Sequence, residues 1–294
     1  MKQHLSILIL LLLVNTTFGQ TYANLHQLDH TKVYYSSDAK ERAIKILDNV
    51  AKAEHFFQSE FNVKADYTLL VLSPADWKTY AHPNAIYGIP HFLPDGRLVV
   101  AAENNDFWKR NTPFIDKIPN ELATILKETY TDKNGEIALT DFFDLLAVHE
   151  LGHAFQHAAG MLKQRTWLYE TFCNVLLHTY FAEKNPAQLP YLTVFPQVAI
   201  QSFPAERLKY NTLEDFEKYY NEIATKHPDN YGWYQCCFHV LAAEIYDLGG
   251  KDVMKKMWDI LMNQNEKLND DDLTDLLIKA HPALEQAITN WNNQ

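Results

Sequence analysis

Residues 140–160 constrain the fold of this 294-residue chain more than any other segment, because their sequence predicts one helix with HELGH at positions 149–153. Thr140 is the predicted N-cap of this helix, and Gly160 supplies the residue at which it ends. Apolar residues flank the motif on both sides. We therefore expect the motif in the middle of a buried helix, with its two histidines turned into the fold.

Histidines four positions apart lie on one face of a helix, so His149 and His153 can both reach one small cation. Imidazole ligands and the Irving–Williams order favour zinc, which we expect at one ion per chain. Glu150 is placed where a carboxylate can take a proton from water activated by the metal. The alternative is a motif that arose by chance in a chain with 13 histidines, or a pair that serves only the packing of a buried helix.

Glu170, on the next predicted helix, offers a third metal ligand. Three protein ligands with one open position are the catalytic arrangement of zinc, whereas structural zinc has four. His157 continues the four-residue spacing, but it lies about 12 Å along the helix axis from His149, too far to share one ion. We expect His157 to line the cleft or face solvent, and His178 and His239 to be polar positions on packed helices. The sequence thus predicts a zinc-dependent peptidase that acts on peptides or proteins.

Residues 1–19 have the proportions of a secretory signal peptide, with a basic Lys2, an apolar run at positions 5–14 and a small, polar exit. That run is too short to span a bilayer, and no later segment of the sequence is apolar enough to do so. We place cleavage near Gly19–Gln20. Residues 20–294 are then expected to be exported, to the periplasm or the extracellular space.

The composition limits the partners and the redox chemistry. A formal charge of −11 argues against nucleic acid or an anionic membrane as a partner, and it leaves the oligomeric state open. Three cysteines, Cys173, Cys236 and Cys237, are too few for a disulfide framework. They lie in apolar helical stretches, so we expect buried thiols, although export leaves open a bridge from Cys173 to either of the others.

The pattern of apolar residues predicts a single domain with an α+β fold and a small mixed sheet. Residues 66–73 and 96–102 predict strands. We expect residues 20–140 to form an α+β subdomain, 141–160 the zinc-binding helix and 161–294 a helical subdomain, with the metal in the cleft between the two halves. Helices are predicted from residue 36 onward and at residues 120–129, 166–184, 212–226, 230–248, 252–262, 271–280 and 283–292.

Two motifs together carry a resemblance to a known family. HELGH is followed by the sequence WLYE at positions 167–170. The pair resembles the gluzincin metallopeptidases, which include thermolysin and the aminopeptidase N family, whose second helix typically has Trp-Leu-Asn-Glu. The resemblance implies a zincin-like fold and a zinc ion held by His149, His153 and Glu170. It also implies that Glu150 is the general base. Sixteen residues separate the second histidine from the glutamate here, against eighteen in the family, and a loop between helices absorbs such a difference.

The resemblance also suggests supporting residues. Asn174, one turn after Glu170, stands close to where thermolysin-like enzymes hold an acid that hydrogen-bonds a zinc histidine, and the alternative is a solvent-facing residue. Gluzincins stabilise the oxyanion with a Tyr or His of the helical subdomain. In the aminopeptidase N family a Tyr begins a helix fifteen residues before a Leu-Gly pair, which here indicates Tyr234, with Tyr231 as the reserve. The alternative for both is a core tyrosine.

Residues 101–104 (AAEN) are similar to part of the Gly-Ala-Met-Glu-Asn segment that holds the substrate's amino terminus in aminopeptidases, which would make Glu103 an amine anchor. We expect the preceding strand to be the edge that pairs with an extended substrate backbone. Endo- and exopeptidase action both stay open. One rival is a catalytically inactive peptidase-like module that binds peptides or a protein partner. Another is a structural zinc site, for which no fourth Cys or His has suitable spacing.

Overall fold

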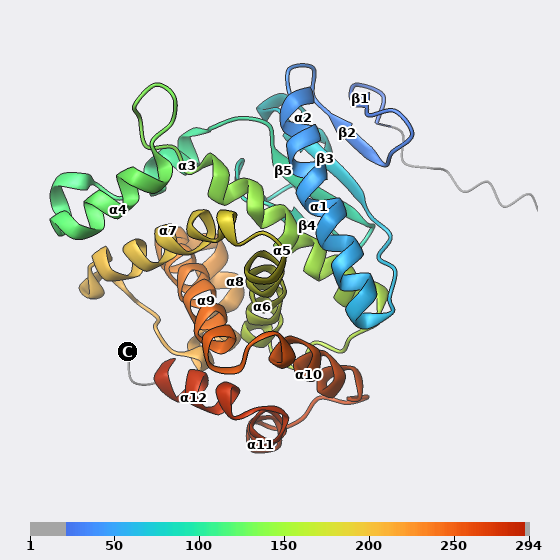
Figure 1. The fold of residues 1–294 in the computed structure, drawn as a ribbon, viewed down its shortest axis with the longest axis vertical. Coiled ribbons are helices and arrows are strands. Elements are labelled where there is room, and N and C mark those ends of the chain that lie inside the picture. Colours follow the sequence, from blue (N-terminus) through green and yellow to red (C-terminus); the bar gives the residue numbers. More distant parts are fainter. Residues whose placement is uncertain (1–21, 292–294) are drawn as a thin grey trace, which may run out of the picture.

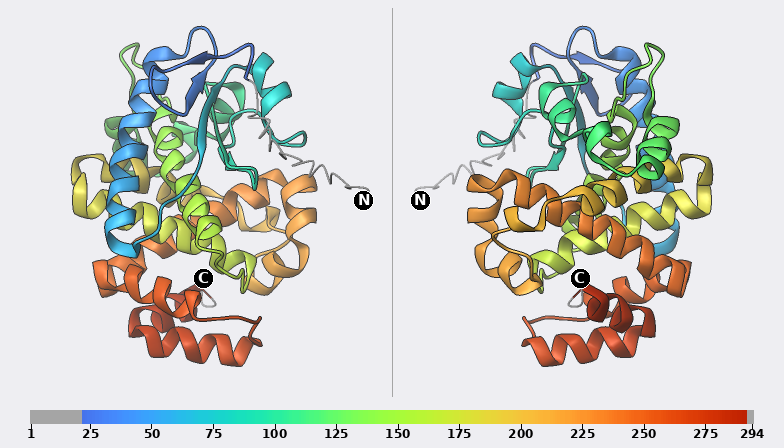
Figure 2. Two further views of the ribbon diagram at one scale, coloured as in Figure 1. Left: turned by 90° about the vertical axis from the view of Figure 1, so that its right-hand side faces the viewer. Right: turned by 90° about the vertical axis from the view of Figure 1, so that its left-hand side faces the viewer.

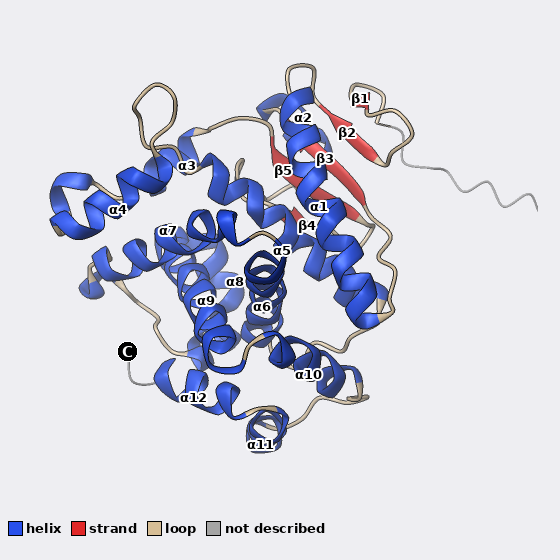
Figure 3. Ribbon diagram, in the orientation of Figure 1, coloured by secondary structure: helices blue, strands red, loops and turns tan. Residues whose placement is uncertain are grey.

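The computed structural model describes residues 22–291, and the predicted signal peptide lies outside this range. A five-stranded mixed sheet belongs to the N-terminal part of the chain, and helices make up most of the rest, so the predicted α+β class is confirmed. The sheet lies at one end of the molecule beside α1 (Lys40–Phe61), and the C-terminal helices gather at the other end. Helix α5 (Thr140–Ala158), which carries HELGH, runs between the two (Figures 1 and 3).

The sheet has the strand order β1-β2-β3-β5-β4. The predicted strands are confirmed as β3 (Thr68–Leu72) and β5 (Arg97–Ala101), which pair in parallel over all five residues of each. β2 (Val33–Tyr35) also runs parallel to β3. β1 (His26–Gln27) and β4 (His91–Phe92) run antiparallel to their neighbours, which makes the sheet mixed, as predicted.

The prediction that β5 forms the edge of the sheet is wrong. β4 pairs with its outer side, with His91 opposite Val99 and Phe92 opposite Leu98. A strand of two residues is too short to show an alternating pattern of apolar side chains, so β4 cannot be predicted from such a pattern. β4 is therefore the edge strand at the β5 end of the sheet, and it also packs against α5.

Helix α5 packs against α1, β4 and β5 on one side and against α6 (Thr166–Lys184) on the other. Because it is covered on several sides, its apolar residues are spread around the helix rather than along one stripe. The helix begins at Thr140, and the cap position is Leu139 without a side-chain hydrogen bond, so the prediction of Thr140 as N-cap is wrong. Gly160 has φ +66°, and the chain leaves the helix through this left-handed residue, as predicted.

Helices predicted from the sequence beyond α5 begin and end within two residues of those observed. Helix α7 (Leu189–Ser202) was not predicted, because Pro190 and Pro196 lie within its sequence. Figure 2 shows the last three helices at the end of the molecule farthest from the sheet. The remaining helices are α2 (Pro74–Tyr80), α3 (Asp106–Asn111), α4 (Asn120–Tyr130), α8 (Leu213–Lys226), α9 (Pro228–Gly249), α10 (Lys251–Met262), α11 (Asp270–Ala280) and α12 (Pro282–Trp291).

The three cysteines are buried and carry free thiols, as expected, and the bridge left open for Cys173 is not formed. Burial raises the pKa of Cys236 to about 12 and raises the pKa of Cys173 well above its ordinary value. These thiols are therefore protonated at neutral pH. Among residues 22–291, no helix has the length and apolar character needed to cross a membrane.

Candidate metal centre

Helices α5 and α6 come close together at Gly152, the glycine of HELGH. A Cβ atom at this position would lie 3.1 Å from Sγ of Cys173 and 3.2 Å from Cδ1 of Leu176, tighter than side chains ordinarily pack. Glycine therefore permits the close approach of the two helices at the level of the histidines. This approach brings Glu170 and Asn174 of α6 beside the imidazole rings of α5.

Three side chains point ligand atoms at one another between the two helices. Nε2 of His149 lies 3.1 Å from Nε2 of His153. Oε2 of Glu170 lies 3.5 Å from the first of these nitrogens and 3.6 Å from the second. The side chains of all three are at most 12% exposed. Ligand atoms around a tetrahedral zinc ion, with bonds of about 2.0 Å, are separated by about 3.3 Å, so the triangle has the size that such an ion needs.

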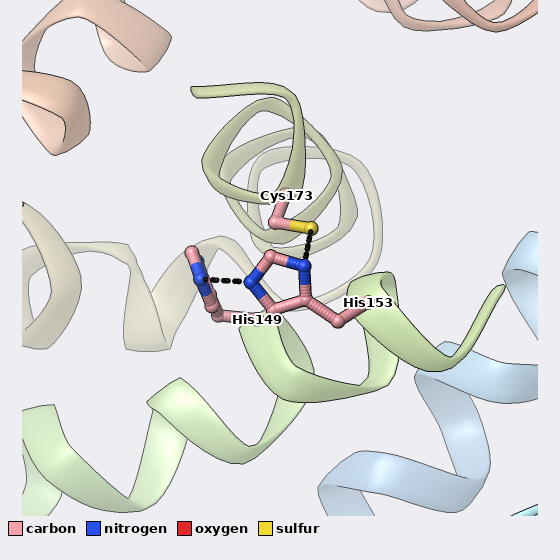
Figure 4. A group of neighbouring side chains, drawn as sticks. All are labelled: His149, His153 and Cys173. Atoms are coloured by element: carbon pink, nitrogen blue, oxygen red, sulfur yellow. Dashed lines mark hydrogen bonds between the residues drawn. The ribbon is translucent and has the colours of Figure 1, made fainter. Parts of the chain in front are cut away.

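A second grouping could also hold a metal ion: one ligand atom each from His149, His153 and Cys173 lie within 4.8 Å of one another. Figure 4 shows the thiol at the edge of the His153 ring opposite His149. Sγ of Cys173 lies 3.2 Å from Nδ1 of His153, whereas His149 contacts Nε2. The two ring nitrogens direct their lone pairs to different sides of the imidazole. Glu170 and Cys173 are therefore partners of His153 on opposite edges of its ring.

Both imidazoles are held at Nδ1 by an amide oxygen. Nδ1 of His149 lies 2.8 Å from Oδ1 of Asn174, and Nδ1 of His153 lies 3.0 Å from Oε1 of Gln156. Asn174 and Gln156 are fully buried. An amide oxygen can only accept, so each Nδ1 carries a proton, and Nε2 is the atom of each ring that can bind an ion. Asn174 is thus not the solvent-facing residue of the alternative.

Glu150 lies buried beside the triangle, with its carboxylate accepting a hydrogen bond from the backbone N–H of Phe92 in the edge strand. Burial raises the pKa of Glu150 to about 7, and the neighbouring carboxylate of Glu170 acts in the same direction. Burial alone would also raise the pKa of Glu170, but His153 and His149 hold it well below its ordinary value. One carboxyl group can therefore exchange a proton near neutral pH while the other stays ionised.

The structure does not support Tyr234 as a residue that faces this site. Its side chain is fully buried, its ring stacks on Trp291, and its hydroxyl donates to the backbone oxygen of Thr212 at 2.9 Å. Tyr234 is therefore the core tyrosine that the sequence left as the alternative. Counting back from the Leu-Gly pair thus leads to a residue of the core.

Tyr231, the reserve, lies one turn earlier on α9 and shares a hydrogen bond with Tyr220 of α8. Burial raises the pKa of both phenols, and the carboxylates of Glu170 and Glu150 raise both further. Helix α8 is kinked at Tyr219, with φ −113° and ψ 17°, directly before Tyr220. The raised pKa values keep both phenols protonated, and because one hydroxyl donates to the other, one O–H of the pair is left to donate elsewhere.

Glu103 is exposed, unlike the three side chains of the triangle. It follows β5 at the end where Arg42 binds the backbone oxygen of Ala101 and pairs with Asp144. Asp144 precedes Glu150 by six residues, or about 9 Å along the helix. The predicted role of Glu103 as an amine anchor is therefore not supported by its position.

The other histidines lie as expected. His157 is exposed, and its ring lies 5.8 Å from that of Phe92. His178 and His239 are buried on the packed helices α6 and α9. Burial lowers the pKa of His178 to about 4, and that of His239 well below its ordinary value. Both are therefore neutral at pH 7.

Sequence reasoning missed two residues of the site, Gln156 and Tyr220. Gln156 follows His153 by three positions, so helical spacing alone places it on the same face, and this signal was available. Tyr220 gave no such signal, because its direction depends on the kink at Tyr219 and on the packing of α8 against α6 and α9.

Comparison with known proteins yields no match: no family model, no curated protein and no solved structure corresponds to this chain. The arrangement of side chains therefore carries the functional argument without support from relatives.

Proposed function

We propose that this chain is an exported zinc-dependent peptidase with a zincin-like fold, related to the gluzincins. The observation that carries the proposal is the triangle of two imidazole nitrogens and one carboxylate oxygen, with separations of 3.1, 3.5 and 3.6 Å, beside the buried Glu150. Three protein ligands match a catalytic zinc site, whereas a structural site has four. Export rests on the signal-like sequence of residues 1–19.

His149, His153 and Glu170 would hold the ion. When bound, zinc would act as a Lewis acid that polarises the substrate carbonyl and activates water. Glu150 accepts a proton from that water on its carboxylate and passes it to the leaving amine. Burial favours the protonated form of Glu150, which suits a group that must take up a proton and then release it.

Tyr231 and Tyr220 are suited to stabilise negative charge as it develops on the carbonyl oxygen. Each phenol keeps its proton, and their mutual hydrogen bond leaves one O–H that can donate to the oxyanion. A fixed O–H donor in a buried site stabilises an oxyanion strongly, because it requires no rearrangement at the moment of reaction. Tyr231 takes the role that the sequence assigned to Tyr234, and Tyr220 holds its hydroxyl by a hydrogen bond.

The strand β4 is suited to bind the substrate backbone. It is the last strand of the sheet, and its Phe92 N–H reaches Glu150, so the sheet ends beside the general base. An extended peptide can add to such an edge through main-chain hydrogen bonds. This arrangement favours peptides or unfolded protein segments as substrates.

A proteome-derived peptide library tests the proposal. The purified protein is stripped with a chelator, and hydrolysis is compared before and after zinc is restored, with cut sites mapped by mass spectrometry. We expect cleavage only with zinc, at sites that share a side-chain preference. A zinc-loaded protein that binds peptides from the library without cutting them would favour the inactive binding module instead.

A further inference from the structure

Gln156 is a fully buried residue on α5 whose side chain makes three hydrogen-bonding contacts. Its Oε1 atom lies 3.0 Å from Nδ1 of His153 and 3.1 Å from Sγ of Cys173. Its Nε2 atom donates to the backbone oxygen of Tyr169 at 3.3 Å. The amide is thus fixed at both ends, by groups of α6 and by the histidine of its own helix.

These contacts determine which way the amide points. Only Nε2 can donate to the Tyr169 oxygen, so Oε1 must face His153 and Cys173. The oxygen then accepts the Nδ1–H of the imidazole and the S–H of the thiol. Cys173 serves as a hydrogen-bond donor in this arrangement, which leaves its sulfur on the edge of the ring away from His149.

We propose that Gln156 is the positioning residue of His153 and that Cys173 is the donor that orients Gln156, rather than a metal ligand. This inference rests on the proposed metal centre and deepens it. Gln156 fixes the Nδ1–H tautomer of His153, which leaves Nε2 free for the ion that His149 and Glu170 share. The ring of Tyr169 also stacks on the imidazole of His153, with the two ring centroids 5.1 Å apart, and this contact restricts rotation of the imidazole.

Metal titration tests this without any need for catalysis. Zinc affinity is measured by competition with a chromophoric chelator for the wild type, Q156L, Q156N and Q156E. We expect Q156L and Q156N to bind zinc about 10–100-fold more weakly, because the first lacks the acceptor and the second is too short to reach. Q156E keeps an acceptor oxygen at the same distance, so it should restore affinity to within a few-fold of the wild type.

Gln164 offers a matched control. It is also buried, and it makes two hydrogen bonds, to the backbone oxygen of Glu266 and from the N–H of Leu268, both at 2.9 Å. Q164L therefore removes a comparable buried amide outside the triangle and should leave zinc affinity unchanged. Equal loss of affinity in Q156L and Q164L would show a general effect on folding and overturn the assignment.

Cobalt substitution tests the role of Cys173 independently. We expect the spectrum of the cobalt protein to lack the sulfur-to-metal charge-transfer band in the near ultraviolet. A charge-transfer band that disappears in C173S would make the thiol a ligand and overturn the inference. A wild type that binds no zinc would overturn the proposed function too, whereas zinc-dependent hydrolysis with an unaffected Q156L would overturn this inference alone.

Discussion

The two sides of the candidate site differ in how their residues are positioned. On one side, α5 and α6 supply His149, His153, Glu170 and Asn174, and these lie together as the spacing of the sequence indicated. On the other side, the edge strand β4 supplies the backbone N–H of Phe92, and the kinked α8 supplies Tyr220. The sequence predicts neither of these groups. Side chains on one regular helix keep a fixed geometry, whereas those on short strands and kinks depend on the packing of distant segments.

The largest effect should come from Glu150, on the helix side. The E150Q variant loses the proton acceptor but keeps the shape of the side chain, so hydrolysis should fall by about 10²–10⁴-fold while zinc content stays at the wild-type level. Peptide cleavage and metal content are measured on the same preparation. Hydrolysis at more than a tenth of the wild-type rate would show that another group accepts the proton.

The second comparison separates two tyrosines one turn apart on α9. Y231F should lower kcat by about 10²–10³-fold, as loss of an oxyanion donor does. Y234F should leave kcat nearly unchanged and lower stability by about 1 kcal/mol, because it removes the hydrogen bond to Thr212. Steady-state kinetics and thermal unfolding of both variants decide the matter, and a larger loss of kcat in Y234F would restore the interpretation drawn from the sequence.

The residues of the candidate site differ in how far they could be predicted from the sequence. The helical half and the HELGH helix follow from apolar periodicity. Glu170 and Asn174 were suggested by the resemblance of the WLYE segment to the gluzincins, and they lie one turn apart on α6. Tyr231 could not be separated from Tyr234, since both are aromatic residues on the same predicted helix. The orientation of α9 relative to the metal centre depends on its packing against α6 and α7, which local sequence does not encode.

A smaller effect is expected at Asn174. N174A should weaken zinc binding by about 10–100-fold, because His149 loses the acceptor that fixes its tautomer. N174D keeps an acceptor oxygen and should bind zinc at least as tightly as the wild type. Chelator competition measures both, and unchanged affinity in N174A would remove Asn174 from the metal centre.

The smallest effect on activity should come from His178, which α6 buries away from the triangle. Burial lowers its pKa to about 4 in the folded protein, from 6.5, so the unfolded chain binds more protons between these two pH values. Its contribution to stability is complete above pH 6.5 and is lost as the pH falls towards 4, by at most about 3 kcal/mol.

H178Q removes this titration. Denaturant unfolding at pH 7 and pH 4.5 should therefore show a smaller loss of stability in the variant than in the wild type, with zinc-dependent hydrolysis at pH 7 little changed. An equal loss of stability in both proteins would mean that His178 is already charged in the folded state at pH 4.5.

The position of the bound ion tests the central claim most directly. Anomalous diffraction at the zinc edge, from crystals of the zinc-loaded protein, locates the ion relative to both edges of the His153 ring. We predict one peak about 2.0–2.2 Å from Nε2 of His149, Nε2 of His153 and a carboxylate oxygen of Glu170. A peak bonded to the sulfur of Cys173, with Glu170 beyond bonding distance, would contradict the account.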